Sequence, residues 1–286
     1  MKEKGNILVF GASGQVGSAL QAYRGVRALS RDHVNLLQPK ACYDVIQTNS
    51  PSAVINASAY TAVDHAELEE EQATVINGHS PAAMARSCRE LGIPFLHIST
   101  DYVFGGAGKD PYTETDAVAP INAYGRTKLL GEQGVQSSGC QYAILRTSWV
   151  FSPRGTNFVR TMLRLSQTRD ELNIVQDQIG GPTPASGIAS ALMTMVSQLQ
   201  QGASSGIYHF AGAPAVSWFD FATQIFRQAQ IDMKLTPVLS EDFPTEAKRP
   251  MNSRLDCSRI EAEFGIQQPD WKAEVEQVIN EFRNNP

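Results

Sequence analysis

Short apolar runs alternate with amphipathic stretches along the first half of the chain. The apolar runs are nearly continuous, which is typical of parallel strands buried on both faces. They are NILVF (6–10), GVRALS (25–30), SAVINASA (52–59), PFLHIST (94–100) and YAILRTSWVF (142–151). The stretches between them predict helices: GQVGSALQAY (14–23), PKACYDVIQTN (39–49), SPAAMARSCREL (80–91) and NAYGRTKLLGEQGV (122–135). This order predicts an α/β fold, a Rossmann-type doubly wound parallel sheet with right-handed connections.

The alternation loosens after about residue 150. The pattern there predicts a helix within 151–167, extended chain over 171–184, and a second helix over 184–199. SGIYHFAG (205–212) reads as one more strand of the first sheet, and SWFDFATQIFRQAQ (217–230) as a further helix. We therefore expect one domain over 1–150, to which the chain returns at about 185–216, and a smaller mixed α/β lobe over most of 151–286.

Composition narrows the class of protein. The 286 residues are 42% hydrophobic and 19% charged, with a net charge of −5 spread over short runs of mixed sign. Such a chain lacks the basic stripe that nucleic-acid binding needs, and no apolar run approaches the ~18 residues of a membrane span. The four cysteines show no metal-ligand spacing. We expect a cytoplasmic protein with no nucleic-acid or membrane partner, and we predict no metal site.

The first chemical motif is a glycine turn. Gly11, Gly14 and Gly17 have G-x-x-G-x-x-G spacing directly after a predicted strand and at the start of a predicted helix. Glycines allow the backbone to approach a pyrophosphate, and the first free N–H groups of the helix face the anion. The motif indicates a dinucleotide site formed by the turn, including Gln15 and Val16. A glycine-rich turn without a ligand is the alternative.

The end of the second predicted strand distinguishes the two nicotinamide dinucleotides. Arg31 follows this strand, and Asp32 comes one position later. A guanidinium matches the geometry of the 2′-phosphate of NADPH, whereas an acidic residue would favour the 2′-hydroxyl of NADH. We expect NADPH, with NADH possible. Topology then places the adenine near Asn35 and Leu36 and the ribose near Ser58, Ala59 and Tyr60, which follow the third strand.

Tyr124 and Lys128 are four residues apart in a predicted helix, so they project from the same face. A nearby ammonium favours the phenolate, and we expect Lys128 to lower the pKa of Tyr124 and to touch the nicotinamide ribose. A phenol within reach of a ketone oxygen donates a proton as hydride arrives at carbon. Thr100, at the carboxyl end of the fourth strand, would hydrogen-bond the same oxygen. An ordinary surface helix with a Tyr and a Lys is the alternative.

Together, these motifs resemble the extended short-chain dehydrogenase/reductase family. Within it, the stretches INASAYTAVDHAE, STDYVFGG, YGRTKLLGE, LRTSWVF, DQIGGPT and RPMNSRLD resemble the branch that acts on dTDP-linked 4-keto-6-deoxysugars. The resemblance covers roughly residues 6–282. It implies reduction of the C4 ketone of dTDP-6-deoxy-L-lyxo-4-hexulose to dTDP-L-rhamnose, with Thr100, Tyr124 and Lys128 as catalytic residues.

The same resemblance implies further substrate contacts. Asp101 and Trp149 match substrate-contacting positions, and Arg249 is the expected partner of the diphosphate. Trp149 has a physical rationale, because an indole face packs well on the apolar face of a deoxysugar. Asp177, Gln178, Thr183, Asn252 and Ser253 would line the nucleotide end. The domain over 1–150 would then bind the dinucleotide, and the lobe over most of 151–286 would bind the substrate.

Two positions depart from the family pattern. Asn35 stands where some members have an acidic residue, and Ala19 stands where some have a Glu that takes part in a metal-bridged dimer. We expect a monomer or a homodimer without that metal bridge.

Two other kinds of protein remain as alternatives. The first is another nucleotide-sugar enzyme, a reductase of a different 4-ketosugar, an epimerase or a 4,6-dehydratase. Tyr102 stands where family dehydratases carry a Glu, which disfavours dehydration. The second is a non-catalytic NADP-binding regulatory subunit similar to that of methionine adenosyltransferase. Such a subunit needs no proton donor at the hydride site.

Overall fold

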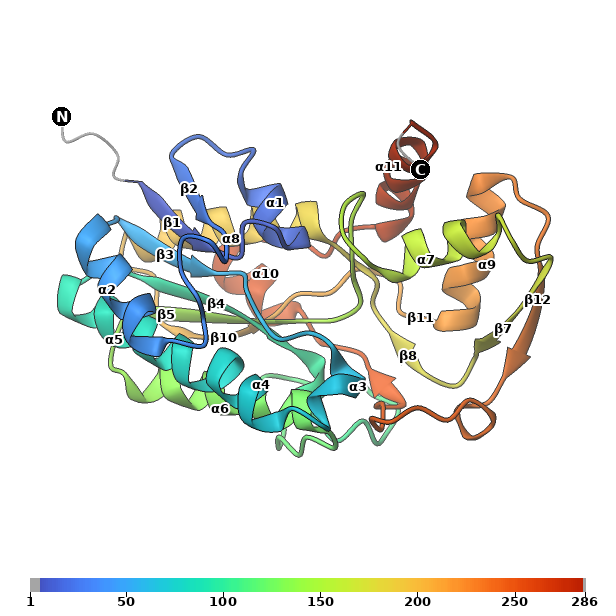
Figure 1. The fold of residues 1–286 in the computed structure, drawn as a ribbon, viewed down its shortest axis with the longest axis horizontal. Coiled ribbons are helices and arrows are strands. Elements are labelled where there is room, and N and C mark those ends of the chain that lie inside the picture. Colours follow the sequence, from blue (N-terminus) through green and yellow to red (C-terminus); the bar gives the residue numbers. More distant parts are fainter. Residues whose placement is uncertain (1–5, 285–286) are drawn as a thin grey trace.

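The computed structural model describes residues 6–284, and a six-stranded sheet forms its centre (Figure 1). The strands are β1 (Ile7–Phe10), β2 (Val26–Leu29), β3 (Ala53–Asn56), β4 (Phe95–Thr100), β5 (Tyr142–Thr147) and β10 (Gly206–His209). They are all parallel, in the order β10-β5-β4-β3-β1-β2. The predicted Rossmann-type sheet is confirmed, including the late strand β10. The order reverses between β1 and β3, and ligands of open α/β sheets bind at such a switch point.

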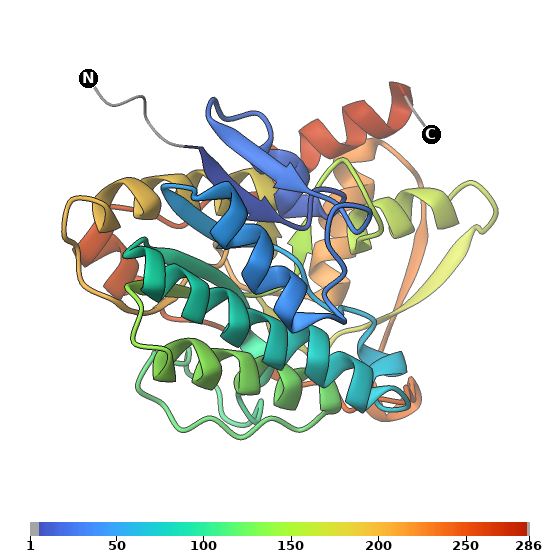
Figure 2. The ribbon, with the colours of Figure 1, turned by 60° about the vertical axis from the view of Figure 1, so that its left-hand side comes forward.

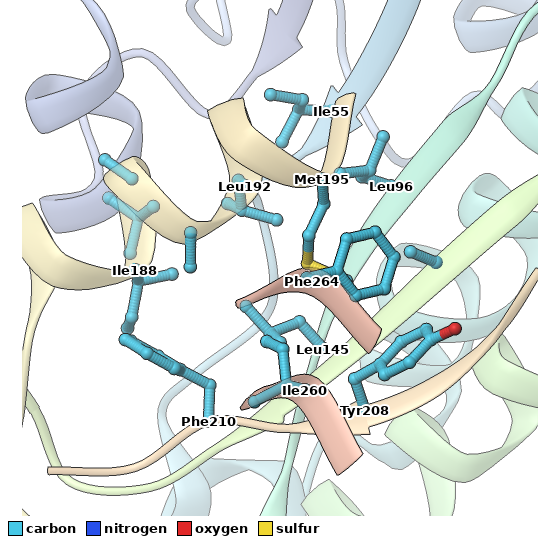
Figure 3. Close-up of a cluster of buried hydrophobic side chains, with 14 of the residues drawn as sticks. Ile55, Leu96, Leu145, Ile188, Leu192, Met195, Tyr208, Phe210, Ile260 and Phe264 are labelled. Atoms are coloured by element: carbon cyan, nitrogen blue, oxygen red, sulfur yellow. The ribbon is translucent and has the colours of Figure 1, made fainter. Parts of the chain in front are cut away.

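Side chains alternate between the two faces of the sheet. Phe10 and Phe95 lie on one face, under α2 (Pro39–Asn49), α5 (Ser80–Leu91) and α6 (Ala123–Ser137). Val9 and Leu96 lie on the other, under α1 (Gln15–Leu20), α8 (Ala185–Leu199) and α10 (Ser258–Phe264). Figure 2 shows α2, α5 and α6 side by side across the first face, and Figure 3 shows the core beneath α8 and α10. Both faces are covered, which explains the continuous apolar strands.

Most predicted helices of this sheet have the expected bounds, and α2 and α5 match them residue for residue. The first helix, α1, is shorter than predicted because it ends at Leu20. Between β3 and α6, four short elements were not predicted: α3 (Val63–Ala66), α4 (Glu70–Thr74), the π-helical turn η1 (Val75–His79) and the 3₁₀ turn η2 (Asp101–Val103). They are each five residues or fewer, too short to show a clear period in the sequence.

The second lobe has its own core. Its helices are α7 (Phe158–Leu165), α9 (Trp218–Ala229) and α11 (Trp271–Asn284). Its strands are β6 (Val150–Phe151), β7 (Glu171–Val175), β8 (Ile179–Gly180), β9 (Thr183–Pro184), β11 (Val216–Ser217), β12 (Lys234–Val238) and β13 (Asn252–Ser253), and η3 (Ser240–Asp242) is a short turn. Buried aromatic and aliphatic side chains from α7, α9, α11 and β7 pack together. The division of the chain at about residue 150 stays a prediction. None of the helices within 6–284 is long and apolar enough to cross a membrane.

Helix α6 approaches the turns η1 and η2 closely because glycines line it. A Cβ on Gly125 would lie 2.2 Å from the Tyr102 carbonyl oxygen, and one on Gly131 would lie 2.1 Å from that of Asn77. The helix begins at Asn122, whose side chain accepts the Gly125 N–H at 2.8 Å. These contacts leave no space for a larger residue at either glycine.

A buried ion pair fixes the same helix from within. Glu132 of α6 forms a two-pronged pair with Arg146 of β5, at 2.9 and 2.7 Å, and also accepts the Ser99 hydroxyl at 2.5 Å. The two charged side chains are only 1% and 3% exposed. Removing one partner would leave the other charge buried without compensation.

We predict that Glu132→Gln lowers the free energy of unfolding by about 3 kcal/mol or more, because Arg146 loses its counter-charge. Urea unfolding followed by circular dichroism measures the change. The matched control is Glu171→Gln, which breaks the exposed pair with Lys234 and should cost less than about 1 kcal/mol. Equal losses in the two variants would contradict the role assigned to the buried pair.

Candidate active site

The glycine turn lies at the switch point between β1 and β3. Gly11 has a φ of +98°, in the left-handed region, and a Cβ there would lie 2.8 Å from the Ala57 carbonyl oxygen. A Cβ on Gly17 would lie 1.9 Å from the Gly11 carbonyl oxygen. Gly14, the residue before α1, is exposed. The turn is therefore folded tightly against the end of β3, with an open backbone at Gly14, and it fits a pyrophosphate.

The side chains of Gln15 and Val16 both contact the protein itself. The Gln15 side chain donates to the Val150 carbonyl at 3.3 Å and accepts from Ser152 and Asn157 at 2.9 and 3.0 Å. Val16 is buried in the core under α1 and α8. Gln15 thus ties the turn to the second lobe, a role that the sequence did not reveal.

The residues expected at the adenine and its ribose lie along the loops after β2 and β3. Arg31 is exposed just beyond the end of β2, and its contact with a phosphate stays a prediction. Asn35 is exposed and accepts the Leu37 N–H at 3.0 Å, while Leu36 packs on the core under α2 and α5. His33 holds Ser30, at the end of this strand, by a 2.8 Å hydrogen bond. Arg31, Asn35 and Leu36 therefore all follow β2, the strand that pairs with β1 at the edge of the sheet.

The segment after β3 is held by two buried asparagines. Both the N–H and the hydroxyl of Ser58 donate to Asn56 Oδ1, at 3.1 and 2.6 Å. The backbone of Tyr60 exchanges hydrogen bonds with the Asn77 amide at 2.8 and 3.1 Å. The loop 58–60 begins beside Gly11, since a Cβ on that glycine would lie 2.9 Å from the Ser58 nitrogen, and the two asparagines fix its backbone.

Thr100, Asp101 and Tyr124 come together at the carboxyl end of β4. The Thr100 hydroxyl donates to Asp101 Oδ1 at 3.0 Å and accepts the Tyr102 N–H at 3.1 Å, and it lies close enough to Tyr124 to act on the pKa of that phenol. Asp101 is buried, and its second carboxylate oxygen, Oδ2, has no hydrogen-bond partner among residues 6–284. Burial raises the pKa of Asp101 to about 6. A buried acceptor beside a phenol and a hydroxyl marks a site where a polar ligand fits.

The Tyr124 phenol is a weaker acid than the sequence suggested, because its pKa is raised. Burial raises the pKa of its phenol, and the Asp101 carboxylate raises it further, while the Thr100 hydrogen bond acts in the opposite direction. The prediction that Lys128 lowers this pKa is wrong for this structure. Lys128 Nζ donates instead to the Ile98 carbonyl at 2.6 Å and lies 3.3 Å from His97 Nε2. At neutral pH the phenol is protonated, the form that a proton donor needs.

Trp149 stands directly before β6 and is packed within the protein. Its φ is +48°, in the left-handed region, and its indole stacks on Trp218 with 3.5 Å between ring centroids. A Cβ on Gly180 would come within 2.6 Å of the same ring. One face of the indole is therefore covered by Trp218, which the sequence did not indicate. A strained residue of this size is typical of a functional position.

Arg249 is paired across the molecule with Asp64 of α3. Its guanidinium donates to both carboxylate oxygens, at 3.0 and 2.6 Å, and Asp64 also accepts the Ala247 N–H at 3.1 Å. The Arg249 side chain keeps 24% exposure. The pair joins the segment after η3 to the sheet domain, beside Tyr102. Sequence reasoning missed Asp64, although it stands in the stretch AYTAVDHAE that carried the resemblance.

The remaining residues expected at the nucleotide end hydrogen-bond mainly to the protein itself. Asp177 accepts the Ser240 N–H and hydroxyl, Thr183 donates to the Gly181 carbonyl, and Asn252 donates to the Asp110 carbonyl. Ser253 is different, because it lies close enough to Asp101 to lower the pKa of that carboxyl. Of this group, Ser253 is the one next to the cluster of Thr100, Asp101 and Tyr124. Within residues 6–284 no group of three or more His, Cys, Asp or Glu could hold a metal ion.

Comparison with known proteins gives one consistent family. The model of the RmlD substrate binding domain family matches residues 5–284. A dTDP-4-dehydrorhamnose reductase of Burkholderia thailandensis is 41% identical over 94% of this chain and 96% of its own length. The crystal structure of a Clostridium acetobutylicum dTDP-4-dehydrorhamnose reductase superposes with a TM-score of 0.91 at 37% identity, covering 97% of this chain and 99% of its own.

A second solved structure bears on the cofactor. The dTDP-4-dehydrorhamnose reductase of Bacillus anthracis, in complex with NADP, has a TM-score of 0.90 at 34% identity. The superposition covers 98% of this chain and all of that one.

We predict that Gly17→Ala weakens NADPH binding at least about tenfold, because the new methyl collides with the Gly11 carbonyl and moves α1 away from the turn. Titration of NADPH fluorescence measures the affinity. The matched control is Gly187→Ala in α8, where a Cβ makes an ordinary 3.4 Å contact. Unchanged affinity in Gly17→Ala would contradict the placement of the pyrophosphate.

Proposed function

The chain belongs to the RmlD substrate binding domain family, and on that premise we propose that it reduces the C4 ketone of dTDP-6-deoxy-L-lyxo-4-hexulose to dTDP-L-rhamnose with NADPH. The observation that carries the proposal is the cluster of Thr100, Asp101 and Tyr124 at the carboxyl end of β4. It contains a protonated phenol, a hydroxyl and an unpaired buried carboxylate oxygen, on the same sheet edge as the glycine turn.

The chain's own residues supply the proton and the alignment. Bound NADPH supplies the hydride to the ketone carbon. Negative charge then develops on the ketone oxygen, and the Tyr124 hydroxyl donates its proton there. The Thr100 hydroxyl donates to Asp101 Oδ1 in the structure. In the proposed reaction it would turn its one proton from Asp101 to the ketone oxygen and stabilise the charge as it forms. Proton transfer from a phenol with a raised pKa still favours the product, because an alkoxide is more basic than a phenolate.

Asp101 has two tasks in this proposal. Its negative charge raises the pKa of Tyr124, so the phenol stays protonated until the ketone oxygen accepts the proton. Its free Oδ2 accepts a hydrogen bond from a hydroxyl of the sugar, which satisfies the one unpaired oxygen of the buried carboxylate. Arg249, with Asp64 as its counter-charge, would bind the diphosphate from the other side of the cleft, near Tyr102.

The proposal also covers the roles of the two parts of the chain, the oligomeric state and the cellular location. Residues 1–150, with the return at about 185–216, would bind the dinucleotide, and most of 151–286 would bind the substrate. Trp149 and its partner Trp218 would form the wall beside the deoxysugar. We infer a cytoplasmic monomer or homodimer that takes a nucleotide sugar and no nucleic acid.

The proposal is tested by following absorbance at 340 nm with purified protein, NADPH and dTDP-6-deoxy-L-lyxo-4-hexulose. Substrate-dependent loss of NADPH with formation of an equal amount of a dTDP-6-deoxyhexose supports it. An epimerase would interconvert sugars without net NADPH consumption, and a regulatory subunit would bind NADPH and consume none. Either result would overturn the proposed reaction.

We predict that Tyr124→Phe lowers kcat by ~10² or more while the affinity for NADPH stays nearly unchanged, because only the proton donor is removed. Turnover is measured at 340 nm and NADPH affinity by fluorescence titration. Unchanged turnover would show that another group donates the proton.

We predict that Arg31→Ala raises KM for NADPH by about tenfold and leaves KM for NADH within about twofold, because a charge-assisted hydrogen bond to the 2′-phosphate is lost. The control is Arg24→Ala, an exposed arginine before β2 rather than after it. Steady-state kinetics with each dinucleotide measures the two KM values. Equal effects on both dinucleotides would exclude a phosphate contact at Arg31.

A further inference from the structure

The segment that carries Arg249 is bound by two side chains that are far from it in the sequence. We call residues 247–249 the arginine segment. Asp64 of α3 accepts both prongs of the Arg249 guanidinium, at 3.0 and 2.6 Å, and the first backbone N–H of the segment at 3.1 Å. Asn122 Nδ2 donates to the carbonyl of Lys248, in the middle of the segment, at 2.8 Å. The backbone and the arginine of this segment are therefore both fixed by hydrogen bonds.

The second of these side chains also caps the helix that carries the phenol. Asn122 is the buried residue directly before α6, and its Oδ1 accepts the Gly125 N–H at 2.8 Å. A backbone N–H can only donate, so the amide atom that faces Gly125 is the oxygen. The NH₂ group consequently faces the Lys248 carbonyl, which can only accept. One buried amide thus joins the arginine segment to the first turn of α6, and Tyr124 stands within that turn.

A second link reaches the same turn through α3. Glu67, directly after α3, accepts the Ala123 N–H at 2.8 Å. Asp64, which pairs with Arg249, belongs to the same short helix. Two of the four backbone N–H groups that a helix leaves free at its start are thereby bonded to side chains of this cluster. A displacement of the arginine segment would therefore act on the helix turn that holds the phenol.

Close packing leaves little freedom between these parts. A Cβ on Gly125 would lie 2.2 Å from the Tyr102 carbonyl oxygen, and one on Gly106 would lie 2.3 Å from the Cβ of Pro250. The start of α6 thus packs on η2, and the loop after η2 packs on the chain that follows the arginine segment. The Tyr102 ring also meets the Tyr124 ring edge to face, with 5.7 Å between centroids. Parts packed in this way cannot yield without a clash, so they pass a displacement on to one another.

We propose that Asn122 is a positioning residue that couples the diphosphate end of the substrate to the proton donor. The proposal rests on the proposed function, in which Arg249 binds the diphosphate and Tyr124 protonates the ketone oxygen. Binding energy from a part of the substrate that does not react raises kcat when it orients the reacting groups. Here the diphosphate would fix the arginine segment, and Asn122 would fix the first turn of α6 relative to that segment. A nucleotide-linked ketosugar is then distinguished from a free ketosugar in kcat as well as in KM.

The first test separates the bond to Lys248 from the helix cap. Serine caps a helix about as well as asparagine but has no NH₂ group, so Asn122→Ser keeps the cap and loses the bond to the Lys248 carbonyl. We expect kcat to fall at least about fivefold in this variant, with KM for the nucleotide sugar and for NADPH within about twofold of wild type. Arg249 keeps its partner Asp64, whereas the phenol loses its alignment. Steady-state kinetics at 340 nm measures these values.

Two further variants serve as controls. Asn122→Ala loses the cap as well, and it should show the same fall in kcat together with a lower urea midpoint. Glu70→Gln weakens instead the exposed pair between α4 and Arg126 in the first turn of α6, and it should leave kcat within about twofold of wild type. A loss of kcat in Asn122→Ala but not in Asn122→Ser would show that only the cap matters, and it would overturn the proposal. A change in KM alone would also overturn it.

The second test needs no turnover. Hydrogen exchange followed by mass spectrometry is measured with and without dTDP, which has the diphosphate but no sugar. We expect dTDP to slow the exchange of a peptide over 122–128 at least about threefold in wild type and to have no such effect in Asn122→Ser. A peptide over 245–252, which covers the arginine segment, should be protected by dTDP in both proteins.

The outcomes distinguish this inference from the proposed function. Protection of 245–252 in wild type without protection of 122–128 would overturn the coupling and leave the nucleotide-sugar assignment standing. Absence of any dTDP binding would overturn both. If dTDP protected both peptides in wild type and only 245–252 in Asn122→Ser, but no ketone was reduced, the coupling would stand and the proposed reaction would fail.

Discussion

The position of helix α6 on the sheet is the constraint on which the site depends. Both Tyr124 and Lys128 stand on this helix, and its glycines allow contacts with Tyr102 and Asn77 that any larger side chain would prevent. The buried pair between Glu132 and Arg146 fixes the helix against β5, one turn beyond Lys128. A shift of α6 by about 1 Å would move the phenol away from Thr100, and errors of that size at a reacting centre are costly.

The same burial has opposite effects on the two ionisable groups of the helix. It raises the pKa of the Tyr124 phenol and lowers that of the Lys128 ammonium to about 8. Asp101 increases the first effect, whereas Glu132 opposes the second. Groups whose pKa values are moved in opposite directions are typical of acid–base sites. Here the result is a phenol that holds its proton, beside a lysine that can release one near neutrality.

The architecture was predictable because both faces of the sheet are covered. Buried parallel strands are continuous apolar runs, and six of them were recognised, including β10, which is far from the others in sequence. Thr100, Tyr124 and the glycine turn were recognised by spacing. The hydrogen-bond partner of Lys128 was not predicted. A spacing of i and i+4 puts two residues on one face of a helix, but it does not say to which atom a long side chain bonds. The Lys128 side chain donates to the Ile98 carbonyl rather than to the Tyr124 phenol.

The missed residues share one feature, which is that their partners are distant in sequence. Asp64 meets Arg249, and Trp218 stacks on Trp149. Pairs of this kind follow from tertiary packing and have no local pattern. His97 and Asn56 carried a weak signal, since each is a polar residue within an apolar strand, and a buried polar side chain there requires a partner.

The most direct measurement follows the hydride itself. NADPH carrying deuterium at the transferring position of nicotinamide C4 is incubated with the protein and dTDP-6-deoxy-L-lyxo-4-hexulose, and the sugar product is examined by mass spectrometry and NMR. The account predicts one deuterium per product molecule, located at C4 of the 6-deoxyhexose. An unlabelled product, or a label at any other carbon, would contradict reduction of the C4 ketone at this site.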